Sequence, residues 1–454
     1  MTSKDVLDEA ATLSESGQRD EALRKILPYL DEHPDDHRAL YIIGGIFNNS
    51  DKPGLAYQLY KRASDLAPTA PAVWHNLGKT MFDCRRLDEA ETCFRRALKL
   101  KPDFANSLDG MALISLNRCE YDLAMDYAER ALKIDPKMLE SQINRGMCRV
   151  AKRQWKEGWP DYNQNIGTDA NRKEIIYGSE TRWNGEKDKT VICYGDQGIG
   201  DEISFASCLP DLIRDSKQVV IDCDGRLKHL FRRSFPQCRV YGNRYAPEGQ
   251  PWHAKYQFNH RVPLGALPQF YRNADADFPG TPYLVPNPEM NIQWRALLDS
   301  LGSGLKVGIS WTGGTPNSGR TRRSVTLETL LPILKLPCHW VSLQYQDPRD
   351  DIEAFHGKHG IKIHHWPHGT QLFDYDCTVS LISQLDLVIS VTTTAIHAAG
   401  SIGKECWCLV PEKPMWRYGG KSEDFPWAKS VTLYRQKGKE WPIHILAGKL
   451  RDKI

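Results

Sequence analysis

The sequence has no apolar run approaching the roughly 20 residues that a membrane-spanning helix needs, so no integral membrane segment is expected. Its first residues, MTSKDVLDEAATL, are polar and helical in pattern, and a signal peptide is not expected either. The 12 cysteines form no CxxC pair and no paired Cys/His spacing of the zinc-site kind. We therefore expect reduced thiols in a cytoplasmic protein.

A strong net charge is also missing. The 60 basic and 57 acidic residues leave a formal charge of +3 and a pI near 8.2. This balance is too mild to indicate nucleic acid or an anionic membrane as a partner. A chain of 454 residues is too long for one hydrophobic core, and its length predicts about three domains.

A period of 34 residues runs through the first third of the chain. Prolines, alanines and small residues keep this spacing: Pro34, Pro68, Pro102, Pro136; Ala22, Ala56, Ala90, Ala124; Gly44, Gly78, Ala112, Gly146. Two helices pack closely only where side chains are small, and one helix pair cannot bury its own face. The pattern predicts stacked helix pairs over residues 1–165 and resembles the tetratricopeptide repeat.

The role of these repeats is open at this point. Their concave face commonly holds a peptide or a partner domain, which would be a binding role for a protein partner. The alternative is a rigid spacer or a dimer contact.

A glycine-rich turn follows the first predicted strand after the repeats, Thr190 to Tyr194. The loop Gly195 to Gly200 leads into a helix near Asp201, and a second strand covers Gln218 to Cys223. A dinucleotide site would need G-x-G-x-x-G, but the glycines here stand as G-x-x-G-x-G. The other interpretation is the acceptor half of a two-domain sugar transferase with Asp201 facing the cleft. Asp201 could equally be a helix cap.

The next core strand, Lys306 to Trp311, precedes a basic, glycine-rich loop from Thr312 to Arg323. Loops at the carboxyl ends of parallel strands bind ligands, so its arginines could meet phosphate, or the loop could be merely solvated. We predict a further strand over His339 to Leu343. Residues 258–286 are predicted to be irregular, and residues 356–368, which are rich in histidine, to form a surface loop.

The stretch LDLVISVTTTAIHAAGSIGKECWCLVP, residues 385–411, predicts a buried parallel strand, a helix over Ala395 to Ile402 and a second strand. Any of its three threonines can cap that helix. A helix start at the carboxyl edge of a parallel sheet favours phosphate, and its dipole favours a neutral imidazole at His397. An ordinary βαβ turn with a packing histidine is the alternative.

Short motifs in a fixed order carry a second resemblance. They are EGWPDY (157–162), WNGE (183–186), GDQGIGDEISFAS (195–207), PYL (282–284), VGISWTG (307–313), RRSVTL (322–327), SLQ (342–344), LDLVISV (385–391), IHAAGSIGKECW (396–407), MWRYGG (415–420) and YRQ (434–436). In this set the chain resembles bacterial tetratricopeptide-repeat glycosyltransferases. Their C-terminal part is related to the heptosyltransferases of glycosyltransferase family 9 and, more distantly, to O-GlcNAc transferases.

The resemblance implies a GT-B fold, with an α-helical repeat array (1–165), an acceptor-side Rossmann-like lobe (166–288) and a nucleotide-sugar-binding Rossmann-like lobe (289–454). It implies an inverting, metal-independent glycosyltransferase without a cofactor, whose donor is a nucleotide-diphosphate sugar. Asp201 would be the general base. The implied donor-binding residues are Gly198, Gly200, Ser310, Trp311, Arg323, Gln344, Thr392, Thr393, Thr394, His397, Trp416 and Arg417.

The chain departs from the heptosyltransferases at two positions. They usually carry Asp and Gly where this chain has Thr392 and Thr394. This difference points away from heptose as the donor sugar and favours the alternative of a repeat scaffold with a degenerate transferase domain. The sequence leaves open the donor base and sugar, the oligomeric state and the acceptor, which could be a glycan, a lipid-linked saccharide, a protein or a nucleic acid.

Overall fold

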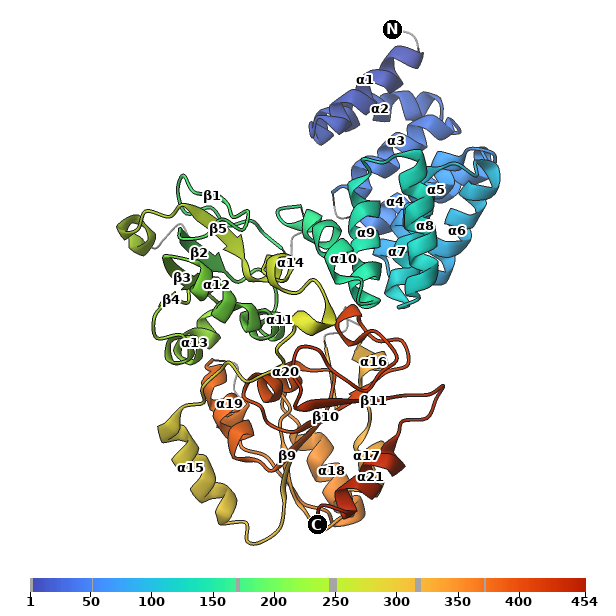
Figure 1. Cartoon of the computed structure of the whole chain (residues 1–454). Helices are drawn as coiled ribbons and strands as arrows, with labels where there is room; N and C mark the ends of the chain where they lie inside the picture. The colour runs from blue at the N-terminus through green and yellow to red at the C-terminus, as the bar shows by residue number, and fades with distance from the viewer. Residues whose placement is uncertain (1–2, 51, 169–171, 245–250, 315–319, 371–372) are drawn as a thin grey trace. The chain divides into compact units, whose positions relative to one another are not determined.

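The computed structural model describes residues 3–50, 52–168, 172–244, 251–314, 320–370 and 373–454 (Figure 1). The chain divides into two compact units, Met1–Arg149 and Val150–Ile454. The first unit thus ends before residue 165, where we placed the end of the repeat array. The predicted divisions 166–288 and 289–454 both fall within the second unit.

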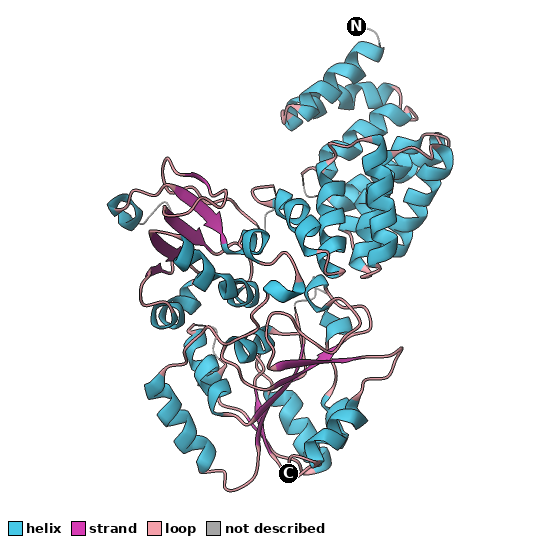
Figure 2. Cartoon of the chain, in the orientation of Figure 1, coloured by secondary structure: helices cyan, strands magenta, loops and turns pink. Residues whose placement is uncertain are grey.

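The described part of the first unit is entirely helical (Figure 2). Its helices are α1 (Ser3–Glu15), α2 (Arg19–Glu32), α3 (His37–Asn48), α4 (Pro53–Leu66), α5 (Pro71–Asp83), α6 (Leu87–Leu100), α7 (Ala105–Asn117), α8 (Tyr121–Ile134) and α9 (Leu139–Ala151). The periodic prolines lie in the turns that follow α2, α4, α6 and α8.

The periodic glycines explain how each helix pair closes. A Cβ at Gly44 on α3 would lie 2.9 Å from the ring of Tyr60 on α4. A Cβ at Gly78 on α5 would lie 2.9 Å from the ring of Phe94 on α6. The small residue of one helix therefore receives the aromatic ring of the next, as the 34-residue pattern predicts.

The second unit combines helices with two sheets. Its strands are β1 (Thr181–Arg182), β2 (Thr190–Tyr194), β3 (Gln218–Asp222), β4 (Arg239–Tyr241), β5 (His260–Pro263), β6 (Lys306–Ser310), β7 (His339–Ser342), β8 (Ile363–His364), β9 (Leu387–Val391), β10 (Cys406–Val410) and β11 (Val431–Arg435). Its helices are α10 (Trp155–Tyr162), α11 (Ile199–Phe205), α12 (Leu209–Asp215), α13 (Lys228–Ser234), α14 (Pro268–Tyr271), α15 (Pro288–Asp299), α16 (Arg320–Arg323), α17 (Leu327–Leu334), α18 (Arg349–His359), α19 (Tyr375–Gln384), α20 (Thr394–Ser401) and α21 (Ile443–Arg451).

Both sheets are parallel in the described residues. The first has the order β1-β5-β2-β3-β4 and the second the order β11-β10-β9-β6-β7-β8. Numbered within itself, the second sheet reads 6-5-4-1-2-3, which is the strand order of doubly wound nucleotide-binding folds. We call residues 166–288, which carry the first sheet, the first lobe, and residues 289–454, which carry the second sheet, the second lobe.

The central strands are apolar because helices cover both faces of their sheet. In the second lobe every residue of β9 is buried, and its core includes Val307, Ile309, Leu387 and Ile389 of the strands together with Leu330 of α17 and Leu446 of α21. A strand buried on both faces reads as an unbroken apolar run, which is why its position was predictable from the sequence.

Two predictions about the fold are wrong. The segment 258–286 was expected to be irregular, but it contains β5, which lies between β1 and β2. The histidine-rich segment 356–368 was expected to be a surface loop, but it contains the end of α18 and the edge strand β8. Both strands are short, with four and two residues, and too few apolar side chains mark them in the sequence.

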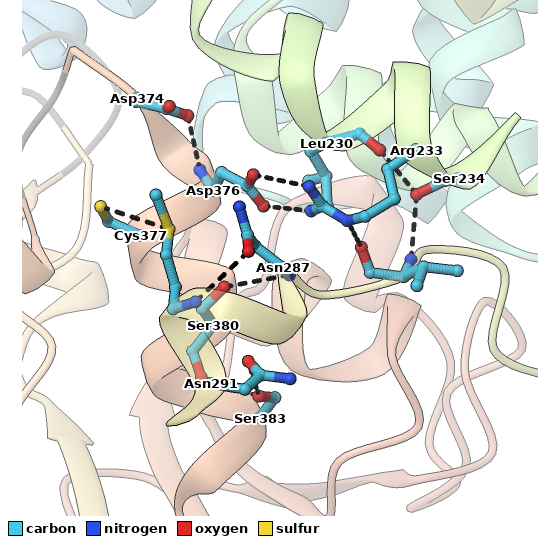
Figure 3. A network of polar contacts seen from close by, with 12 residues as sticks. Leu230, Arg233, Ser234, Asn287, Asn291, Asp374, Asp376, Cys377, Ser380 and Ser383 are labelled. Atoms are coloured by element: carbon cyan, nitrogen blue, oxygen red, sulfur yellow. Dashed lines mark hydrogen bonds and ion pairs between the residues drawn. The ribbon is translucent and has the colours of Figure 1, made fainter. Parts of the chain in front are cut away.

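A polar network joins the two lobes at the linker between them (Figure 3). Arg233 of α13 donates from Nη1 to Asp376 Oδ2 of α19 at 2.9 Å, and its Nη2 pairs with Oδ1. The same guanidinium donates from Nε to the carbonyl of Val285 at 2.8 Å, and Ser234 Oγ accepts from the Val285 N–H at 2.9 Å. One arginine thus fixes a helix of each lobe and the segment between them.

Candidate functional site

The candidate site lies where the strand order of the second sheet reverses. β6 and β9 are neighbours, and the strands that follow each of them lead away in opposite directions. In doubly wound sheets the carboxyl ends of two such strands leave a crevice, and ligands bind there. Ser310 stands at the end of β6, and Thr392 to Thr394 follow the end of β9.

Thr393 caps the helix that follows β9. Its backbone is extended, with φ −122° and ψ 176°, and its Oγ1 accepts a hydrogen bond from the Ala395 N–H at 3.3 Å. The hydroxyl of Ser390 lies 3.0 Å from the same oxygen and fixes its position. Of the three threonines that could cap α20, the middle one does so. The helix start presents N–H groups and the positive end of the helix dipole beside the crevice.

Arg323 lies against this turn. Its Nε donates to Thr392 Oγ1 at 3.1 Å, and its Nη2 donates to the carbonyl of Thr392. Arg320, on the same short helix, lines a different cavity next to Trp311. Residues 315–319 of the predicted basic loop lie outside the described residues.

A cavity of about 380 Å³ opens between the carboxyl ends of these strands and the first lobe, a volume usual for small-molecule sites. We call it the β6–β9 cavity. It is lined by Ile199, Arg226, Ser310, Gly314, Arg323, Leu343, Tyr345, Thr370, Tyr375, Thr378, Thr393, Thr394 and Ala395. Among these described residues there are two arginines and no carboxylate, so the lining favours an anionic ligand.

Gln344 and Trp311 shape the cavity without lining it. Gln344 Oε1 accepts from Ser310 Oγ at 2.7 Å, from the Trp311 N–H at 3.0 Å and from the Thr312 N–H at 3.2 Å. The Trp311 side chain is buried in the core of the second lobe. Ser310, Trp311 and Gln344 are the predicted donor-binding residues at the ends of β6 and β7. Of these three, only Ser310 lines the cavity.

Asp201 lies in the first turn of α11, across from the second lobe. Its Oδ1 accepts a hydrogen bond from Arg417 Nη2, and the guanidinium lies 4.6 Å from the ring of Phe205 and 4.5 Å from that of Trp416. Asp201 is 38% exposed, whereas Arg417 is 5% exposed. Arg417 and Trp416, which we assigned to donor binding, therefore serve to hold Asp201 and do not line the β6–β9 cavity.

Two glycines of the GDQGIGD loop have separate roles. Gly198 is the residue that precedes α11 and takes the cap position, so the alternative of Asp201 as the helix cap is wrong. Gly200 allows α11 to approach α20, since a Cβ there would lie 3.1 Å from Thr394 Oγ1 and 3.3 Å from the His397 ring. The loop thus brings Asp201 close to the helix that starts at Thr394.

His397 is held by two hydroxyl groups. Its Nδ1 lies 2.7 Å from Ser204 Oγ of α11, and its Nε2 lies 2.9 Å from the hydroxyl of Tyr418. Burial, with Arg417 and Arg323 nearby, holds the pKa of this imidazole well below its usual value. The ring is neutral and joins the two lobes, and it does not line the cavity to which the sequence assigned it.

Sequence reasoning missed several residues of the cavity wall, including Arg226 and Thr378. Arg226 comes from the loop after β3, and Thr378 comes from α19, where its hydroxyl is buried without a hydrogen-bond partner. The rule that loops after parallel strands bind ligands could have pointed to Arg226. No sequence signal marks Thr378.

Two further observations concern the described residues as a whole. No group of three or more His, Cys, Asp or Glu side chains within them is arranged to hold a metal ion. No helix in the described ranges has both the length and the apolar content needed to cross a membrane.

Comparison with known proteins identifies the helical array. Tetratricopeptide-repeat family models match residues 7–71 and 71–104. The N-terminal helices are tetratricopeptide repeats.

The similarity to one relative extends well beyond these repeats. The chain is 28% identical over 423 residues to Protein FlbA of Caulobacter vibrioides, an alignment that covers 88% of this chain and 70% of that protein. It is also 31% identical over 124 residues to the Protein CTR9 homolog of Arabidopsis thaliana, and 25% identical over 104 residues to the BBSome complex member BBS4 of Mus musculus. These two alignments cover 26% and 23% of this chain but only 11% and 20% of the relatives.

Two solved structures illustrate the similarity of about a third of the chain to known proteins. MamA is 20% identical, with a TM-score of 0.30, over 34% of this chain and 90% of that one. A thermophilic tetratricopeptide-repeat protein of Thermus thermophilus is 18% identical, with a TM-score of 0.33, over 36% of this chain and 90% of that one.

Polar contacts cross-link the first helices of successive tetratricopeptide repeats. Thr80 Oγ1 lies 3.2 Å from Asn48 Oδ1, which joins α5 to α3, and His75 Nδ1 lies 3.2 Å from Ser107 Oγ, which joins α5 to α7. Asp109 of α7 accepts at Oδ1 from Ser141 Oγ of α9 at 2.7 Å. Successive repeats are therefore joined by buried and partly buried polar contacts, whereas the glycine–ring contacts close each helix pair.

We expect His75 to make the stability of the repeats depend on pH. Burial, with Lys79 as a lesser cause, lowers its pKa to about 4 from the usual 6.5. Between these values the unfolded chain binds more protons, so the free energy of unfolding falls as pH drops below about 6.5. We expect a loss of roughly 1–2 kcal/mol at pH 5 relative to pH 7 that is absent in His75→Gln. Urea unfolding of both full-length proteins, followed by circular dichroism, measures it. An equal loss in both would rule out His75 as the source.

Proposed function

We propose that the protein is a metal-independent glycosyltransferase that moves a sugar from a nucleotide-diphosphate sugar to a hydroxyl acceptor, and that its two lobes form a GT-B fold. One observation carries the proposal. The start of α20 and Arg323 line one cavity at the point where the strand order of the second sheet reverses. Helix starts and arginines are the protein groups best suited to a diphosphate.

The proposed reaction assigns the role of general base to Asp201. Asp201 takes the proton of the acceptor hydroxyl as the hydroxyl oxygen attacks the anomeric carbon. The bond from that carbon to the diphosphate oxygen breaks, and the leaving diphosphate carries away the electron pair. Arg417 keeps the Asp201 carboxylate in place, because its guanidinium is itself fixed between two aromatic rings. Inversion at the anomeric carbon is implied by the family resemblance.

The charge on the leaving group must be met mainly by hydrogen-bond donors. A helix dipole contributes only about 0.3–1 kcal/mol, whereas a single preorganised donor is worth roughly 100- to 1000-fold in rate. The N–H groups of Thr393 and Thr394 and the guanidinium of Arg323 are the proposed donors, since the Ala395 N–H is bound to Thr393 Oγ1. Thr392, in the place of an acid, accepts from Arg323 and so contributes to its orientation.

Arg323→Ala should weaken binding of the nucleoside diphosphate by roughly 10- to 100-fold, since a hydrogen bond to a charged group is worth about 1.5–3 kcal/mol. Isothermal titration with UDP, ADP and GDP, in each case on the full-length protein, measures this. Arg320→Ala is the matched control, because it removes an arginine of the same helix that lines another cavity. Equal losses in the two variants would refute a specific role for Arg323.

A second candidate function is a binding scaffold whose tetratricopeptide repeats hold a protein partner and whose transferase half is degenerate. The repeats themselves favour it, as do the departures at Thr392 and Thr394. A thermal-shift screen with UDP-, ADP- and GDP-sugars separates the two. A shift accompanied by slow donor hydrolysis supports the enzyme, and no shift with any nucleotide supports the scaffold.

A further inference from the structure

Four side chains, alternately acidic and basic residues, form a series of contacts through the first lobe to the wall of the β6–β9 cavity. Arg244 lies 2.9 Å from Glu202 Oε1 through its Nε and 3.2 Å from Asp224 Oδ2 through its Nη2. Arg226 then donates from Nε and Nη2 to the two oxygens of Asp224, each at 2.8 Å. The Asp224 N–H also donates to Glu202 Oε2 at 3.0 Å, which joins these two residues directly.

Only one end of this series of four side chains reaches solvent. The side chains of Glu202, Arg244 and Asp224 are 0%, 4% and 4% exposed, whereas Arg226 is 32% exposed and lines the cavity. Buried ion pairs add little stability, because desolvation offsets their attraction. The contacts instead orient Arg226, since two parallel hydrogen bonds hold its guanidinium in a single plane.

The four side chains also place a positive charge at the cavity. Burial raises the pKa of Glu202 to about 8 despite Arg244, so this carboxyl is mostly protonated at neutral pH. Burial opposes ionisation of Asp224 as well, but the hydrogen bonds from Arg226 outweigh it and hold the pKa at about 2. Two arginines therefore face one carboxylate, and the net charge of the four is +1.

Arg226 stands on the opposite lobe from the diphosphate groups. Arg323 and the Thr393–Ala395 turn belong to the second lobe, and Arg226 belongs to the first, which also carries Asp201. The transferred sugar must lie between the diphosphate and the acceptor, so Arg226 faces the sugar. Sugar hydroxyls both donate and accept, so arginine can bind a neutral sugar, but only a carboxylate also offers it an opposite charge. Its planar fork matches a carboxylate.

Building on the proposed function, we propose that the transferred sugar is a sugar acid and that Arg226 binds its carboxylate. Arg226 is then the residue that selects the donor. Donors with the same base and diphosphate are distinguished by the acid group on the sugar alone.

The test compares matched donors that differ in one carboxylate. UDP-glucuronate is titrated against UDP-glucose, and GDP-mannuronate against GDP-mannose, with UDP and GDP as reference ligands. The full-length wild-type protein should bind the acid of the pair with the correct base about 10-fold more tightly or better. Arg226→Gln should bring the two affinities together and leave the affinity for the free nucleoside diphosphate unchanged.

Three controls make the result specific. Arg214→Gln removes an arginine that likewise pairs with neighbouring aspartates but does not line the cavity, and it should keep the preference. Arg226→Lys keeps the charge and should restore part of the preference. Melting temperatures of all variants check that the fold persists.

Each remaining outcome decides against the proposal. Equal binding of acid and neutral sugar by the wild type overturns it while the proposed transferase survives. A loss of UDP or GDP affinity in Arg226→Gln as large as the loss of acid affinity makes Arg226 a phosphate ligand. Absence of binding by UDP, GDP, ADP and all four nucleotide sugars overturns the proposed function itself.

Discussion

Replacing Asp201 by Asn should lower the rate of sugar transfer, or of donor hydrolysis where the acceptor is unknown, by roughly 100- to 10,000-fold and leave nucleotide affinity within about twofold. An amide cannot take the proton of the acceptor hydroxyl. It keeps the size of the carboxylate and still accepts the hydrogen bond from Arg417. Turnover and nucleotide binding are measured on the same preparation.

Asn is a better probe than Ala at this position. Arg417 is 5% exposed and is surrounded by Phe205, Trp416 and Trp427. Asp201→Ala would leave this buried guanidinium without its carboxylate, at a cost below the roughly 3–5 kcal/mol of a wholly buried pair because Asp201 is 38% exposed. A loss of activity in the Ala variant would then mix chemistry with stability.

Asp215→Asn is the control for the Asn variant. Asp215 also pairs with an arginine, Arg214, but it lies at the end of α12 and not on α11, so turnover should be unaffected. If Asp201→Asn lost nucleotide affinity in proportion to turnover, Asp201 would be a structural residue and the proposed general base would have to be another group.

One helix connects the proposed base to the proposed phosphate-binding turn. Along α11, Gly200 allows the close approach of Thr394, Asp201 pairs with Arg417, and Ser204 contacts His397. A shift of α11 would therefore disturb all three contacts at once. The proposed base and the start of α20 keep a fixed geometry because contacts at two positions, Gly200 with Thr394 and Ser204 with His397, tie α11 to α20.

The local parts of this arrangement could be predicted from the sequence. The strands β2, β6 and β9 lie where their apolar runs predicted them, within one residue at each end. The start of α20 lies one residue from the prediction, because a threonine-rich turn after a buried strand leaves few alternatives. The repeat period likewise follows from the close packing of glycine against aromatic rings.

The contacts between distant segments could not be predicted in the same way. Arg417 meets Asp201 across 216 residues of sequence, and His397 meets Ser204 across 193. No local pattern states which of two lobes a side chain will face. Arg417 and His397 were consequently assigned to the donor, although the structure has them bridging the lobes. For the same reason, the sequence could not predict the contacts among Glu202, Arg244, Asp224 and Arg226.

Replacing Arg233 by Met should lower the free energy of unfolding by roughly 2–4 kcal/mol, because it leaves the carboxylate of Asp376, 1% exposed, without its bidentate partner (Figure 3). The value lies below that for a wholly buried pair, since Arg233 itself is 23% exposed. Combining Arg233→Met with Asp376→Leu should recover most of the loss, as the unpaired buried charge is then gone. Urea unfolding of the three full-length proteins measures both effects. A double variant as unstable as the single one would show that the contacts of Arg233 to Val285, and not its charge, hold the lobes.

Since Tyr375 and Thr378 flank Asp376 on α19 and line the cavity, the single variant should also weaken nucleotide binding. A protein in which this network served stability alone would bind nucleotide as before.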